Sequence, residues 1–164
     1  ASICTSVNDV VVHGVPSDEV VLKDGDIISI DCGTLLDGFN GDSAYTFCVG
    51  EVSPEVKQLL KTTKESLYIG IEQAVAGKHI GDIGAAVQQH CGNGVMLKAG
   101  MCIAIEPMVT LGDRQIWMLP DKWSIVTRDR KPAAHFEHTI AIRRGKAEIL
   151  STFEEIEHLE GQIY

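Results

Sequence analysis

Four carboxylates lie within or beside apolar stretches of this sequence, where acids are uncommon. They are Asp31, Asp42, Glu106 and Glu137. Asp31 closes the apolar run 27–31, and Glu106 and Glu137 each interrupt a segment that is otherwise typical of a buried strand. A charged carboxylate in such surroundings is costly unless it is paired, hydrogen-bonded or bound to a metal. Because clustered oxygen ligands suit divalent cations and can bridge two of them, the pattern predicts a dinuclear metal site.

Each acid taken alone also has an ordinary structural explanation. Asp31 and Asp42 could cap turns, where Asp is common. Glu106 precedes a proline and could end a strand, and Glu137 could pair with its neighbour His138 if that residue is protonated. Four separate explanations of this kind are less economical than one shared site, so the joint pattern favours metal binding.

Composition narrows the possible partners. The 164 residues fit one domain with a substantial core, which we expect to span 1–164. A net charge of −9 argues against nucleic acid as a partner, because phosphate binding needs clustered Lys and Arg. No apolar stretch reaches the roughly 18 residues of a membrane span, so we expect no membrane partner.

Five cysteines, an odd number without CxxC spacing, predict free thiols rather than a disulfide framework. They are Cys4, Cys32, Cys48, Cys91 and Cys102. A free thiol in an apolar run behaves as a small hydrophobic side chain. Because a reducing compartment suits such a pattern, we expect a cytoplasmic protein.

The segments between the acids predict an α+β domain. Strands are expected over 3–12, 27–32, 44–49, 102–106, 115–118, 123–127, 135–143 and 147–151. Ser53 and Pro54 are typical of a helix start, and apolar residues at helical spacing extend that helix to about Ala76. Asp82 is expected to cap a second helix that runs to roughly Gln89, and a short helical turn is expected near 154–159.

His13 lies in a turn before Gly14 and Pro16 and has two interpretations. A histidine in such a turn is commonly an exposed polar residue. Alternatively, a neutral imidazole could reach over a pocket and hydrogen-bond a substrate or transition state. Composition does not separate the two.

At this point the motifs resemble those of the type I methionine aminopeptidases over nearly the whole chain. The matching segments are Asn8 with 13–16, 25–31, 37–43, 100–108, 123–129 and 136–139. The intervals from His13 to Asp31, from Asp31 to Asp42 and from Glu106 to Glu137 also agree with that family. The resemblance implies the pita-bread fold, in which two pseudo-symmetric halves surround a central dinuclear metal site.

The resemblance also implies a role for each acid. Asp31 would chelate one metal, Asp42 and Glu137 would bridge both, and Glu106 would bind the other metal and handle protons. The two divalent ions could be Co, Mn, Fe or Zn, because oxygen ligands accept several metals.

The resemblance also implies that three further residues contact the substrate. His13 would contact the substrate and stabilise the transition state, while Cys4 and Trp123 would line the methionine pocket. A plain core tryptophan is an equally good interpretation of Trp123. The implied substrates are N-terminal methionyl peptides of nascent chains with a small second residue. We expect a monomer. A transient contact with the ribosome is also compatible with the resemblance.

The match fails in one region. The family has a further histidine ligand in a Gly-His-Gly motif, and no such motif occurs here, where the chain reads 88–96 as Gln-Gln-His-Cys-Gly-Asn-Gly-Val-Met. The Asp42–Glu106 interval of 64 residues is roughly thirty shorter than in the family. Either a segment near 91–96 is omitted from the sequence, which we favour, or the protein lacks it. The family's N-terminal extension is also absent before Ala1.

A smaller departure is His135, where the family usually has Gln; we expect it to affect the surroundings of the metal ligands. Two other functions remain open. The chain could be a non-catalytic pita-bread binding module that has lost the histidine ligand. It could also be a related aminopeptidase directed at proline, although motifs around the last two acids differ.

Overall fold

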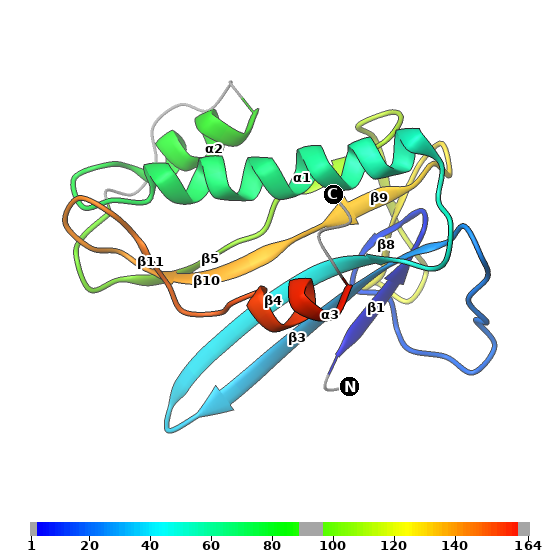
Figure 1. Cartoon of the computed structure of the whole chain (residues 1–164), viewed down its shortest axis with the longest axis horizontal. Coiled ribbons are helices and arrows are strands. Elements are labelled where there is room, and N and C mark those ends of the chain that lie inside the picture. Colours follow the sequence, from blue (N-terminus) through cyan, green and yellow to red (C-terminus); the bar gives the residue numbers. More distant parts are fainter. Residues whose placement is uncertain (1–2, 89–96, 161–164) are drawn as a thin grey trace.

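The computed structural model describes residues 3–88 and 97–160. The predicted missing segment near 91–96 and His90 lie outside these residues. A six-stranded antiparallel sheet forms the centre of the molecule, in the order β1-β3-β4-β10-β11, with β5 paired to β10 (Figure 1). These strands are β1 (Cys4–Val7), β3 (Ile27–Leu36), β4 (Phe39–Cys48), β5 (Cys102–Ile105), β10 (Glu137–Ala141) and β11 (Glu148–Ile149).

Two smaller sheets flank the main one. One has the order β2-β8-β7 and the other pairs β6 with β9. Their strands are β2 (Val10–Val12), β6 (Met108–Thr110), β7 (Ile116–Met118), β8 (Ile125–Thr127) and β9 (Ala133–His135). The sequence analysis predicted segments that contain β2, β7 and β8. It did not identify β6, and its single strand over 135–143 overlaps β9 only at His135.

The β3–β4 hairpin is longer than predicted and projects beyond the rest of the sheet (Figure 1). Its strands run without interruption to a two-residue turn at Asp37 and Gly38, which both have positive φ, at 50° and 81°. This conformation is that of a type I′ turn, for which Asp-Gly is a favoured sequence. Asp31 and Asp42 therefore lie inside paired strands, and the interpretation of these acids as turn caps is wrong.

Three helices complete the fold: α1 (Pro54–Gln73), α2 (Ile80–Gln88) and α3 (Glu154–Glu160). The start of α1 is as predicted, with the Val56 amide donating to Ser53 Oγ. This helix ends three residues early because Ala76 donates its backbone N–H to the Arg143 carbonyl instead of continuing the helix. Asp82 lies in the first turn of α2 rather than before it, and accepts from the His79 amide.

The core fills the space between α1 and the main sheet. Leu60 and Leu67 of α1 are fully buried, as are Phe136 and Ile140 on the sheet side. Because α1 runs along β9 and β10, it fixes the segment that carries Glu137 (Figure 1). No helix in the described part of the chain is long and apolar enough to cross a membrane.

Candidate metal centre

Three predicted ligands are brought to one face of the main sheet by strand register. Asp31 of β3 pairs with Ala44 of β4, and Ala44 pairs with Glu137 of β10. Residues directly opposite each other in a sheet share a face, and so do residues two apart on one strand. Asp42 therefore joins the same face. Ala44, which has a small side chain, lies between Asp31 and Glu137 in this register.

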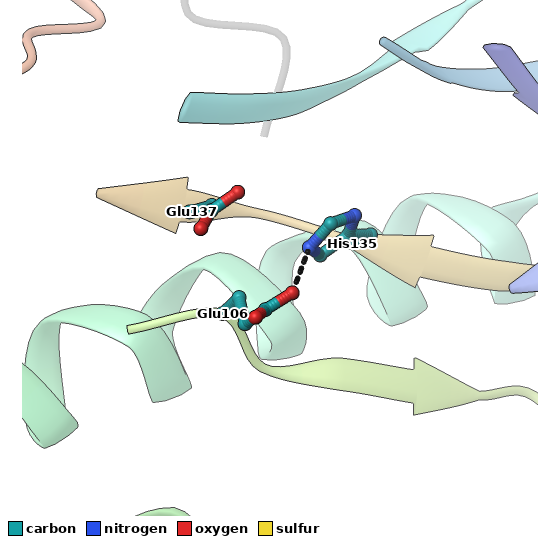
Figure 2. Close-up of side chains that lie close together, drawn as sticks. All are labelled: Glu106, His135 and Glu137. Atoms are coloured by element: carbon teal, nitrogen blue, oxygen red, sulfur yellow. Dashed lines mark ion pairs between the residues drawn. The ribbon is translucent and has the colours of Figure 1, made fainter. Parts of the chain in front are cut away.

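The ligand atoms form two clusters that have one member in common. One oxygen each from Asp31, Asp42 and Glu137 lie within 4.8 Å of one another. One ligand atom each from Glu106, His135 and Glu137 satisfy the same limit, and Figure 2 shows these three side chains close together. Because Glu137 belongs to both clusters, the arrangement suits two neighbouring cations that share a carboxylate.

The second cluster lies where two neighbouring strand segments are each interrupted. Glu106 and Pro107 separate β5 from β6, and Phe136 separates β9 from β10. Since β5 pairs with β10 and β6 pairs with β9, the two interruptions lie opposite each other. The Phe136 amide donates to the Pro107 carbonyl across this junction. The proline thus releases Glu106 from the strand pairing and lets its side chain reach towards Glu137.

Hydroxyl groups hold the acids of the first cluster in place. The Thr139 hydroxyl accepts from the Asp42 amide at 2.8 Å and donates to the Asp42 carbonyl at 2.7 Å. The Ser43 hydroxyl donates to the Glu137 carbonyl, and the Ser43 amide donates to Asp42 Oδ1. These bonds tie the backbone of β4 to that of β10 at the level of the ligands.

The electrostatics of the site favour a cation. Burial, and then repulsion from Asp42 and Glu106, raises the pKa of Glu137 to about 8 from 4.5. Burial and the nearby Asp42 also raise the pKa of Asp31. Glu106 differs, because interaction with the His135 side chain lowers its pKa. Charged acids this close repel each other, and divalent ions would relieve the repulsion. The donor set of four carboxylates and one imidazole therefore fits the metals predicted from sequence.

The interpretation of Glu137 as the partner of a protonated His138 is wrong. His138 points to the opposite face of β10, where its ring nitrogens lie 3.5 Å from Tyr68 Oη and 3.0 Å from Ser151 Oγ. Burial lowers its pKa to about 4, so the ring is neutral at ordinary pH. A cation that compensates ionised Glu137 therefore has to lie on the other face of β10, where Asp31 and Asp42 also lie.

The side chains of His13 and Trp123 are in contact. Their rings stack with centroids 4.5 Å apart, and His13 Nδ1 lies 3.3 Å from the Trp123 carbonyl oxygen. Trp123 is 52% exposed, so it is not a core tryptophan. After His135, the charge of His13 is a further cause of the lowered pKa of Glu106, which places His13 within electrostatic reach of the acids.

A close backbone approach positions His13. The Thr5 amide of β1 donates to the Gly14 carbonyl at 2.8 Å, and the Gly14 amide donates to Ser6 Oγ. A Cβ atom on Gly14 would lie 2.1 Å from the Thr5 carbonyl oxygen, so only glycine fits there. His13 itself has a positive φ of 63°, a strained conformation that this anchor maintains.

Cys4 of β1 lies next to the first cluster. It pairs with Asp31 across β1 and β3, so its side chain faces the same way. Burial and the adjacent Asp31 raise the pKa of its thiol. Cys4 therefore stays a neutral, apolar thiol beside the carboxylates, which suits the wall of a small pocket.

His135 is the site residue whose position the sequence analysis did not foresee. It was expected only to affect the surroundings of the ligands, yet its ring belongs to the second cluster. The spacing could have indicated this, because residues two positions apart in an extended segment point to the same face, as His135 and Glu137 do.

A comparison with known protein families identifies the family of this chain. The model of metallopeptidase family M24 matches residues 1–96. The chain belongs to this family. It is therefore a metallopeptidase that uses divalent metal ions.

Methionine aminopeptidases are similar to this chain over most of its length. Methionine aminopeptidase 1 of Bacillus subtilis is 43% identical, with 92% of this chain and 73% of that protein covered. The methionine aminopeptidase of Clostridium acetobutylicum is 40% identical, with coverages of 94% and 74%. The crystal structure of methionine aminopeptidase from Thermotoga maritima superimposes with a TM-score of 0.86 at 37% identity, covering 90% of this chain and 72% of that one.

The fold prediction is confirmed. Besides these relatives, the prolidase from Pyrococcus furiosus shares the fold, with a TM-score of 0.74 at 19% identity. The match covers 93% of the present chain and 49% of the prolidase. All have the pita-bread fold. The far higher identity to methionine aminopeptidases does not favour the interpretation as a proline-directed enzyme or as a non-catalytic module.

The metal-free protein is expected to lose stability as the pH rises from 6.5 to about 8. In this interval folded Glu137, whose pKa is about 8 rather than 4.5, binds more protons than the unfolded chain does, so deprotonation favours unfolding. Neutral His138 has the opposite effect, but only below pH 6.5. Urea unfolding at pH 6.5, 7.2 and 8 measures the slope, which Glu137→Gln should flatten. Rising stability over this range would contradict the assignment.

Gly14→Ala is expected to destabilise the fold by about 1–3 kcal/mol and to displace His13, because the added Cβ collides with the Thr5 carbonyl. Urea unfolding measures the loss. Gly41→Ala is the matched control, since its Cβ would meet only the Thr34 hydroxyl, at 3.1 Å. Equal stability of the two variants would show that the close approach at Gly14 is not required.

Proposed function

We propose that this chain removes the N-terminal methionine from peptides and nascent proteins whose second residue is small. The single observation that carries the proposal is the pair of ligand clusters joined at Glu137. This arrangement occurs in a chain that is about 40% identical to methionine aminopeptidases over most of its length. Residues 1–164 would form one catalytic domain, acting as a monomer in the cytoplasm. Free thiols at Cys4, Cys32, Cys48 and Cys102 support that location.

The four acids would hold two divalent ions, which could be Co, Mn, Fe or Zn. Asp31 and Asp42 belong to the first cluster, Glu106 to the second and Glu137 to both. The geometry supports Glu137 as the bridging ligand, and Asp42 falls in the first cluster only. When bound, such ions supply Lewis acidity and lower the pKa of water.

The side chains around the ligands would handle the substrate. The free α-amine of the substrate would bind near the metal ions, which accounts for action at a chain terminus. Glu106 is half-exposed and its pKa is lowered, so it is ionised and can accept a proton and pass it on. His13 can donate a hydrogen bond to a carbonyl oxygen, and its stacked partner Trp123 restricts the ring. Cys4 and Trp123 would contribute to the methionine pocket.

We further propose that the natural protein contains an additional segment of roughly thirty residues near 91–96. The alignment with the Clostridium acetobutylicum relative is 186 residues long, whereas 94% of this 164-residue chain is about 154 residues. The relative thus carries about 32 positions without a counterpart here. The retention of four acids that require a cation also supports a complete ligand set in the natural protein.

Peptide mapping of the natural protein by mass spectrometry tests the additional segment. The expected result is a set of peptides containing residues between Gln88 and Leu97 that are absent from the present sequence. At the mean residue mass of this chain, 17.8 kDa over 164 residues, thirty residues add about 3 kDa. A continuous peptide with the present sequence would show that the segment is absent and would favour the binding-module alternative.

Hydrolysis of Met-Ala-Ser with added Co²⁺, Mn²⁺ or Fe²⁺ tests the proposed activity. The expected result is release of free methionine that chelation abolishes, with no cleavage of Xaa-Pro peptides. The metal that supports turnover at its cellular concentration would identify the native ion. Cleavage of Xaa-Pro peptides alone would transfer the chain to the proline-directed branch of the fold.

Glu137→Ala is expected to abolish both metal binding and peptide cleavage, because it removes the ligand that the two clusters share. Calorimetric titration with Mn²⁺ measures the binding. Glu148→Ala, which removes an exposed acid paired with Arg143, is the control and should bind normally. Retention of two bound ions by Glu137→Ala would refute the bridging assignment.

Glu106→Gln is expected to leave folding intact and to lower kcat by about 10²–10⁴-fold, the usual contribution of a general acid–base residue. Single-turnover kinetics with saturating metal separate this effect from weaker metal binding. Near-normal turnover would exclude Glu106 from proton handling.

A further inference from the structure

We propose that His135 is a direct nitrogen ligand of the metal in the second cluster, together with Glu106 and Glu137. The inference rests on the proposed metal centre and adds a ligand to it. His135 is the only nitrogen donor in either cluster among the residues that the structure describes. Its side chain is 1% exposed, so its ring is enclosed by protein.

The backbone of His135 is held on both sides by one hydroxyl group. The His135 amide donates to Thr46 Oγ1 at 3.0 Å, and this hydroxyl donates to the His135 carbonyl at 2.7 Å. The Thr46 proton is then used, so Ser29 Oγ, 2.8 Å away, must donate to Thr46. Pairing with Met108 of β6 completes the anchorage. A residue fixed in this way presents its ring to the cluster in one orientation.

The ring nitrogen that faces the cluster has no hydrogen-bond partner in the described part of the chain. This atom, Nε2, is completely buried. It lies 3.3 Å from Glu106 Oε2, as the dashed line in Figure 2 marks, but without the alignment of a hydrogen bond. A buried polar atom without a partner costs free energy, and native proteins rarely leave one unexplained. A shared cation accounts for this atom.

The distance between the two atoms fits a shared cation. Metal–nitrogen and metal–oxygen bonds to divalent ions such as zinc are about 2.0–2.2 Å long, so two adjacent ligand atoms on one ion lie roughly 3 Å apart. The observed 3.3 Å between His135 Nε2 and Glu106 Oε2 is close to this value. An imidazole among carboxylates also shifts the preference of a site towards Fe, Co or Zn and away from Mg or Ca.

The competing explanation is that His135 only positions Glu106 through an ion pair. Both explanations predict weaker metal binding when His135 is changed, because residues next to ligands commonly alter affinity by about 10–100-fold. Affinity alone therefore does not separate them. Only a ligand transmits unpaired electron density from a paramagnetic ion into its ring.

Proton NMR of the 164-residue chain loaded with Co²⁺ makes the distinction. The expected spectrum contains a strongly shifted, exchangeable imidazole N–H signal that disappears in His135→Gln. This variant keeps an amide donor for Glu106 and so preserves the positioning role. His79→Gln, which removes a partly exposed histidine outside both clusters, is the control and should keep the signal. The second binding step of His135→Gln should weaken at least tenfold by calorimetry.

The outcomes are separable. Two bound ions without a shifted imidazole signal, or a signal that persists in His135→Gln, would overturn the ligand assignment and leave the proposed function intact. Failure of the chain to bind Co²⁺ at all would overturn both. If His135→Gln does not fold, X-ray absorption of the Co²⁺-loaded wild type and of a His13→Gln, His90→Gln double variant decides. Imidazole scattering retained in the double variant supports His135, and its absence from either protein excludes it.

Discussion

Mutual repulsion among carboxylates is the constraint on which the site depends. Glu137 is buried, and Asp31, Asp42 and Glu106 all contribute to the rise in its pKa. Repulsion between these acids lowers the stability of the folded state, and packing elsewhere in the fold must offset that loss. The hydroxyls of Ser43 and Thr139 and the core beneath α1 hold the acids in place, and a cation converts the repulsion into binding energy.

The architecture supplies the ligands from strands that are distant in sequence. The β3–β4 hairpin contributes Asp31 and Asp42, the end of β9 contributes His135 and the start of β10 contributes Glu137. These two units meet where Ala44 pairs with Glu137. Because a shift of register by one residue would move a whole set of side chains to the other face, the metal centre depends on the exact pairing of β4 with β10.

Much of this could be predicted from the sequence, because acids within apolar runs are rare and their cost implies compensation. The prediction located all four acids and most strands. It missed the length of the β3–β4 hairpin, since the predicted strands ended at 32 and began again at 44, whereas the pairing continues to Leu36 and Phe39. The contact of His135 with Glu106 and the exposure of Trp123 depend on tertiary packing, which spacing along the chain does not determine.

The sharing of Glu137 by both clusters has a consequence for how ions enter the site. Two sites that use one carboxylate cannot fill independently, because the first ion changes the charge and orientation of a ligand that the second ion needs. Thermodynamic linkage makes this coupling reciprocal, so the factor by which one ion alters the affinity for the other is the same in both directions. The availability of one metal thereby sets how strongly the protein holds its neighbour, and the half-loaded state has its own affinity rather than an average of the two.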